Sequence, residues 1–257
     1  MKGILIVASH EGASGYNSIG RNFSASTSRE IAEDINAVAR AIQEQGFETY
    51  SFYTKTKEDP ATFSWYGNYL EKGITPVKKD EVKGLLATID GVILLGFSAK
   101  AGTQNAFLDH TLYDYAIFDY KIDGQSKGAI GICKTFFHSN GIPVLMSSGC
   151  LAACNEAKEE GIESCVVTKT AQENWRNTAI LRDIKEVHEE LYATAKRVLA
   201  NAKRFEKTNR TVTVEIEFIR EDFLENFAYK NKTFERVNAR TLKKTIEIDD
   251  EIGGLLV

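Results

Sequence analysis

Short polar segments follow several apolar stretches of the sequence, and their side chains are types that perform acid–base or nucleophilic chemistry. Ser9-His10-Glu11, Ser98-Ala99-Lys100 and Gly149-Cys150 are these segments. A histidine next to a carboxylate can move protons near neutral pH. A cysteine that begins a helix can act as a nucleophile, because the helix dipole favours the thiolate. Core packing is the alternative for Cys150, since free cysteines are commonly buried and Cys154 follows one turn later.

Strand and helix patterns alternate along most of the chain. Residues 3–8 and 91–96 are continuous apolar runs, typical of strands buried on both faces. The alternation predicts an α/β fold, with a mostly parallel sheet flanked by helices. Further strands are expected at 47–53, 143–146 and 165–167, and helices at 28–45, 80–87, 128–140, 150–158 and 179–205. Thr27 and Glu30 form an expected capping box, and residues 54–80 show no clear period.

The pattern changes after residue 208. Val212, Val214, Ile216 and Phe218 alternate with polar residues, which indicates a half-exposed strand, and a helix at 221–229 and a strand at 245–248 follow. We therefore predict an α/β core over residues 1–208 and a small α+β appendage over 209–257, packed on the core.

Composition excludes several classes of function. The net charge is −4, which argues against nucleic acid or an anionic membrane as the main partner, and no apolar stretch approaches the ~18 residues of a membrane span. Ser9-His10-Glu11 stands where a signal peptide would have its cleavage site, so we expect a cytoplasmic protein. The four cysteines include no C-x-x-C pair, and reduced thiols are expected.

Taken in order, the loops resemble the zinc-dependent D-aminopeptidase (DppA-like) family, which removes N-terminal D-amino acids from short peptides. The resemblance rests on an ordered set of segments: Glu11-Gly12-Ala13-Ser14-Gly15, Arg21-Asn22-Phe23, Leu94 to Ala101, Asp109-His110-Thr111, Pro143 to Met146 with Gly149 and Ala153, and Thr213 to Phe218. None of these segments is specific alone.

The resemblance implies two zinc ions, but most ligand positions are changed in this chain. Glu11 keeps its place, whereas the other ligands fall on Ser9, Lys55, Ser98 and Ala129. Zinc needs about four N, O or S ligands, and a lysine adds a cation where a cation should bind. We therefore expect that the inherited zinc pair is lost and that the protein has no metal cofactor. A single metal at His10, Glu11 and His110, with Asp109, is the alternative, although strand alternation would point His10 and Glu11 to opposite sides.

By the same resemblance His110 matches the catalytic histidine of the family, and Lys100 a basic position beside the active site. We expect catalytic roles for His110, Glu11 and Cys150, with His110 as base for the thiol in a metal-independent hydrolase. Ser9, Ser98, Lys100 and Lys55 are expected to bind substrate, and the two lysines would bind a carboxylate or phosphate unless they are solvated surface residues. A retired site filled with small polar residues is the other interpretation.

The expected function is action on, or binding of, a small peptide- or amino-acid-like substrate, with amide hydrolysis as the chemistry. The alternative is an inactive binding or scaffold protein that uses the oligomer surface of the family. Family members form large homo-oligomeric rings, and the aromatic segments 63–69 and 113–120 could supply such contacts or belong to the core. His188 is expected on a helix surface and His138 in a turn.

Overall fold

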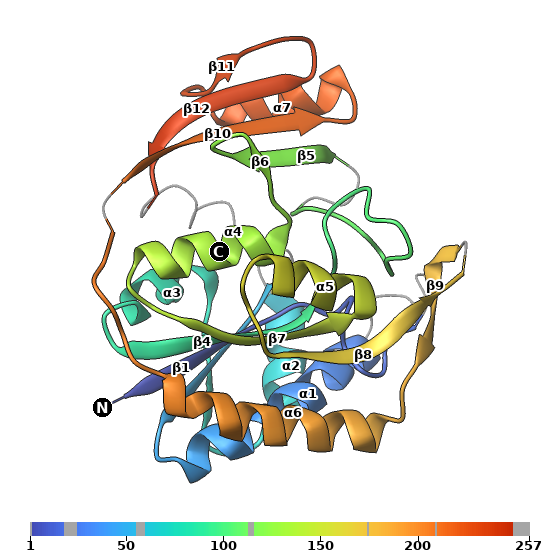
Figure 1. Cartoon of the computed structure of the whole chain (residues 1–257), viewed down its shortest axis with the longest axis vertical. Helices are drawn as coiled ribbons and strands as arrows, with labels where there is room; N and C mark the ends of the chain where they lie inside the picture. The colour runs from blue at the N-terminus through green and yellow to red at the C-terminus, as the bar shows by residue number, and fades with distance from the viewer. Residues whose placement is uncertain are drawn as a thin grey trace.

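The centre of the fold is a seven-stranded sheet that begins with the first apolar run. The computed structural model describes residues 2–17, 25–54, 60–112, 116–173, 175–208 and 210–248. The strand order is β3-β2-β1-β4-β7-β8-β9 (Figure 1). All neighbours in this sheet pair in parallel except β8 and β9, which are antiparallel. The seven strands are β1 (Gly3–Ala8), β2 (Glu48–Tyr53), β3 (Ile74–Pro76), β4 (Ile89–Phe97), β7 (Val144–Cys150), β8 (Cys165–Gln172) and β9 (Trp175–Leu181).

Helices cover both faces of this sheet (Figure 1). On one face lie α1 (Ala25–Glu44), α2 (Pro60–Tyr69) and α6 (Ile184–Val198), which a short 3₁₀ helix, η2 (Leu199–Asn201), extends. On the other face lie α3 (Lys79–Leu85), α4 (Ala129–Ser139) and α5 (Leu151–Glu159). Both faces of β1 and β4 are therefore buried, as their apolar sequences require. The predicted α/β fold is confirmed.

The chain reverses its direction across the sheet between β1 and β4. It runs outward from β1 through β2 to β3, returns to β4 on the other side of β1, and then continues to β7 and β8. In open α/β sheets, the carboxyl ends of the strands at such a switch point form a crevice that commonly binds ligands. The segments Ser9-His10-Glu11 and Ser98-Ala99-Lys100 follow these two strands.

A second, antiparallel sheet lies at one end of the molecule with α7 (Glu221–Lys230) against it (Figure 1). Its strand order is β11-β12-β10-β5-β6. These strands are β5 (Ile117–Ile122), β6 (Gln125–Ser126), β10 (Thr211–Phe218), β11 (Glu235–Arg236) and β12 (Thr241–Glu247). The second sheet thus contains residues from both sides of position 208, while the domain division itself stays a prediction.

Some element boundaries differ from the sequence expectations. The first helix begins at Ala25, so Thr27 lies inside it and the expected capping box is wrong. The helix expected from residue 179 begins at Ile184 instead, with Asp183 as its N-cap, because residues 175–181 pair with β8 as an edge strand. The segment 54–80 contains α2 and β3, which have no strong sequence period. None of the described helices is long and apolar enough to cross a membrane.

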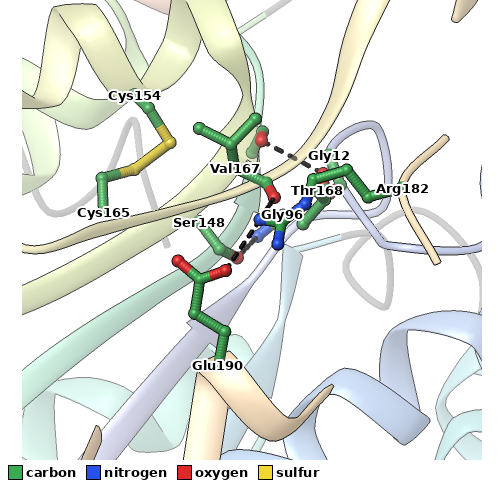
Figure 2. Close-up of a disulfide and its surroundings, with 10 residues drawn as sticks. Gly12, Gly96, Ser148, Cys154, Cys165, Val167, Thr168, Arg182 and Glu190 are labelled. Atoms are coloured by element: carbon green, nitrogen blue, oxygen red, sulfur yellow. Dashed lines mark hydrogen bonds and ion pairs between the residues drawn. A yellow bond between two sulfur atoms is a disulfide. The ribbon is translucent and has the colours of Figure 1, made fainter. Parts of the chain in front are cut away.

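A disulfide joins Cys154 on α5 to Cys165 at the start of β8, and it corrects the expectation that all thiols are reduced (Figure 2). The sequence could not show this pairing, because the two cysteines are separated by 11 positions without a recognised motif. Cys133 and Cys150 lie outside this bond and are buried. The disulfide therefore fixes α5, the helix that follows β7, to the start of β8.

Candidate functional site

Glycines allow the loops after β1, β4 and β7 to meet closely. A Cβ atom on Gly12 would lie 2.6 Å from the carbonyl carbon of Gly96 and 2.8 Å from Cα of Gly149. Gly12 N donates to Gly96 O over 2.8 Å, and the Thr168 hydroxyl donates to Gly12 O over 2.7 Å (Figure 2). The loops that carry Ser9-His10-Glu11 and Ser98-Ala99-Lys100 are therefore held together by backbone contact.

Glu11 is the centre of the candidate site, with a histidine on each side. Its Oε1 atom lies 3.6 Å from Nε2 of His10 and 3.7 Å from Nε2 of His110. The Ser9 hydroxyl donates a hydrogen bond to the other carboxylate oxygen, Oε2. Strand alternation predicted opposite directions for His10 and Glu11, and this is wrong because β1 ends at Ala8 and the chain turns immediately afterwards.

The charge of Glu11 is stabilised by these neighbours. Burial by itself would raise the pKa of the carboxyl group. The positive potential of His10 and His110 and the hydrogen bond from Ser9 outweigh burial, and together they lower the pKa to about 2. Glu11 is consequently a carboxylate at every pH at which proteins normally work.

His110 is held in one orientation by the loop that carries it. Its Nδ1 atom lies 2.9 Å from the carbonyl oxygen of Leu108 and 3.0 Å from the hydroxyl of Ser98. A carbonyl oxygen can only accept, so Nδ1 carries a proton and donates it to Leu108. The backbone N–H of His110 donates to Ala99 O over 3.0 Å, which ties this loop to the segment after β4. Nε2 is left to face Glu11.

The loop before and after His110 is strained. Leu108 and Leu112 have φ values of 52° and 60°, in the left-handed region that bulky side chains rarely occupy. Such strain costs about 1–3 kcal/mol per residue and is concentrated at functional sites. The loop keeps this strained conformation and places the His110 ring against Glu11. This supports a functional role for that placement.

Lys100 contributes through its backbone, which contacts a buried glutamate. Its N–H donates to Oε2 of Glu156 on α5 over 2.7 Å. The other carboxyl oxygen of Glu156 is buried and has no hydrogen-bond partner among the described residues. Burial is the main reason that the pKa of Glu156 is raised to about 7. Sequence reasoning missed Glu156, because a lone glutamate on a helix carries no signal.

Cys150 is the N-cap of α5, as the sequence predicted, and only 1% of its surface is exposed. The structure therefore places the Cys150 thiol inside the protein. Its catalytic role stays a prediction.

The remaining candidates fall into separate places. Lys55 lies outside the described residues, as does the segment Arg21-Asn22-Phe23. His188 lies on α6 and is half-buried rather than fully exposed: its Nε2 lies 3.0 Å from Oδ1 of Asp34, a fully buried carboxylate that also accepts from the Ser14 hydroxyl over 2.6 Å. His138 is at the end of α4, with its ring against Phe205.

The described residues do not offer a recognisable metal centre. Within them, no group of at least three His, Cys, Asp or Glu side chains is arranged to hold a metal ion. Ser98 at one inherited ligand position binds His110, and Ala129 at another begins α4 without a donor side chain. These residues do not fit a pair of zinc ions, so no chemical step is derived through zinc.

Comparisons with known proteins identify the family. The family model described as D-aminopeptidase matches residues 71–252, which is most of the chain. A solved structure, the Zn-dependent D-aminopeptidase DppA from Bacillus subtilis, a self-compartmentalizing protease, matches with a TM-score of 0.82 and 18% sequence identity, covering 100% of this chain and 95% of that one. No curated protein matches in sequence. The chain belongs to the D-aminopeptidase family.

Proposed function

We propose that this protein hydrolyses the amide bond of a small peptide- or amino-acid-like substrate, with Glu11 and His110 as its acid–base groups and without the binuclear zinc of the family. The observation that carries the proposal is the position of Oε1 of Glu11 between Nε2 of His10 and Nε2 of His110. The family description supports peptides with an N-terminal D-amino acid as the first substrates to test.

The geometry allows one complete sequence of proton transfers. Because Nδ1 of His110 donates to Leu108, the neutral ring has its lone pair on Nε2, where it can take a proton from a water molecule. The water oxygen bonds to the amide carbon, and the C–N bond breaks after the imidazolium returns the proton to the leaving nitrogen. The carboxylate of Glu11 stabilises the imidazolium between these steps.

The other polar groups support this pair. Ser9 donates to Glu11 and Ser98 contacts His110, so in this proposal they orient the acid–base groups as well as contact substrate. Lys100 and Lys55 are proposed to bind the substrate carboxylate. Cys150, with His110 as its base, is the alternative nucleophile. Alkylation of its thiol in the folded protein tests that role, since a side chain that is 1% exposed should react slowly.

An oligomer is part of the proposal. The structural relative is named a self-compartmentalizing protease. Apolar side chains are exposed around the second sheet, with Tyr229 at 79%, Phe118 at 55% and Val237 at 54%. Of the aromatic segments expected to make contacts, Tyr66 and Tyr120 are buried in the core instead. An inactive scaffold with the same contacts is the second candidate, and these exposed apolar side chains are the observation that favours it.

The test combines activity, metal content and mass. Hydrolysis of D-alanine p-nitroanilide is expected with wild-type protein, and H110A and E11Q should lose about 10²-fold or more of kcat. The matched control is H138A, which removes a histidine at the end of α4. Activity that needs zinc, with two zinc ions bound per chain, would overturn the metal-free mechanism. Absence of turnover on D- and L-amino amides, with a stable oligomer by light scattering, would favour the scaffold.

A further inference from the structure

Lys169 is a fully buried lysine near the carboxyl end of β8, and its side chain reaches the loop after β1. Its Nζ atom donates to the carbonyl oxygens of Glu11 over 2.9 Å and of Ala13 over 2.5 Å, and also to that of Tyr16. These carbonyls belong to the loop of residues 11–16, here called the Glu11 loop. One side chain therefore joins β8 to the backbone of the central carboxylate residue.

The surroundings of Nζ suit a cation. The ring centroids of Phe107 and Tyr16 lie 5.0 and 5.7 Å away, within the range of cation–π attraction. Carboxylates on the packed elements favour its charge: Asp34 and Glu30 on α1 and Glu11 in its loop, with His188 of α6 against Asp34. Burial opposes the charge more strongly than these groups favour it, and the pKa of Lys169 is lowered to about 7.

Three hydrogen bonds from Nζ hold the backbone of the Glu11 loop. An ammonium group has three N–H donors, which match the three carbonyl acceptors. An apolar side chain at this position would have no donor, so these buried carbonyls would lose this partner. Leaving a buried acceptor unpaired is costly, and the Glu11 loop would loosen.

We propose that Lys169 is a positioning residue, whose ammonium group fixes the Glu11 loop and thereby holds the Glu11 carboxylate between His10 and His110. The inference rests on the proposed function for its catalytic meaning, whereas the fixing of the loop can be measured without any activity. Removal of a buried lysine that did not reach these carbonyls would leave the order of this loop unchanged.

The first test compares K169M with wild type by amide hydrogen exchange. Methionine keeps the buried volume and removes all three donors. We expect exchange in residues 9–17 to be about tenfold faster in K169M, while α4 (Ala129–Ser139) exchanges as before. The matched control is K185M, an exposed lysine on α6. A folded K169M with wild-type exchange in the Glu11 loop would overturn the proposal.

The second test uses wild-type protein and therefore does not depend on the folding of K169M. Because Nζ of Lys169 is buried and donates to three carbonyl oxygens, its N–H protons should exchange slowly enough with water to be observed by ¹⁵N NMR, whereas those of the exposed Lys185 should not. Rapid exchange of the Lys169 side-chain protons would contradict the proposal.

Two further readouts separate positioning from catalysis. In K169M the NMR signals of the His10 and His110 rings should move while those of His138 stay, because only the first pair contacts Glu11. If the enzyme is active, kcat should fall more than KM changes. If the loop is loosened in K169M but the wild-type protein has no hydrolase activity, the positioning of Glu11 by Lys169 stands. Only the proposed function is then overturned.

Discussion

The Nε2 atom of His110 lies 3.7 Å from Oε1 of Glu11, although the two residues come from loops that follow different strands of the sheet. The contact depends on the parallel pairing of β1 and β4, which brings the loops after these two strands to the same edge of the sheet. It also needs the strained backbone at Leu108, whose carbonyl oxygen fixes the His110 ring. The strand order and the strained loop together place the His110 ring against the carboxylate of Glu11.

The carboxylate of Glu11 should stabilise the folded protein in a defined range of pH. Its folded pKa, about 2, is below the ordinary value of 4.5, so its contribution is complete above pH 4.5 and is lost as the pH falls toward 2. E11Q removes this contribution, which is of order 3 kcal/mol for such a shift. Urea unfolding at pH 7, 4.5 and 3 measures it.

The stability difference between wild type and E11Q should therefore be largest at pH 7 and shrink in acid. E159Q, on the exposed side of α5, is the control and should show no such trend. A difference between wild type and E11Q that stays constant from pH 7 to pH 3 would show that the two histidines do not stabilise the charge of Glu11.

Gly12 should tolerate no side chain. A Cβ atom there would meet backbone atoms of Gly96, Phe97 and Gly149 at 2.6–2.8 Å, and backbone cannot move aside as a flexible side chain can. We expect G12A to lower the free energy of unfolding by at least about 3 kcal/mol. G84A is the matched control, because a Cβ on Gly84 meets nothing within 4 Å and alanine favours the helix α3.

Chemical denaturation followed by fluorescence measures both glycine variants. G84A should be as stable as wild type or more stable by up to about 1 kcal/mol. Equal stability of G12A and wild type would mean that the loops after β1, β4 and β7 are not in backbone contact.

Much of the fold could be predicted from sequence, because buried parallel strands are continuous apolar runs. The runs at residues 3–8 and 91–96 became β1 and β4, and the polar residues after them became the site. The tight turn between β5 and β6 also follows from local sequence, since Asp123 and Gly124 take positive φ values that an Asp-Gly pair favours. Local pattern suffices for such features.

Contacts between distant segments were beyond the sequence. Lys169 lies in a strand of mixed polarity, and nothing local indicates that its Nζ reaches the carbonyls of the Glu11 loop. The Asp34–His188 contact and the Cys154–Cys165 disulfide depend in the same way on how helices and strands pack. The sequence pattern predicts a helix from residue 179, but residues 179–181 belong to the edge strand β9. Pairing with β8 outweighs the weak local helix preference of these residues.

The Cys154–Cys165 disulfide should be measurable by counting thiols. Unfolded, unreduced protein should show two reactive thiols, from Cys133 and Cys150, and four after treatment with a reductant. For a closed loop of this short length, the double variant C154S/C165S should be less stable by roughly 2–3 kcal/mol. C133S is the control for removal of a buried sulfur. Four thiols before reduction would show that the bond does not form.

Glu156 should make stability depend on pH in the opposite direction to Glu11. Burial raises its folded pKa to about 7, above the ordinary 4.5, so its stabilising contribution is present below pH 4.5 and is lost as the pH rises through 7. E156Q keeps an acceptor for Lys100 N and cannot ionise. The variant should therefore gain stability relative to wild type between pH 5 and pH 8, by up to about 3 kcal/mol.

Thermal unfolding of wild type and E156Q across this pH range tests the prediction, with E163Q on the exposed turn before β8 as the control. A relative stability of E156Q that does not change with pH would mean that Glu156 is ionised throughout, with Oε1 solvated rather than buried.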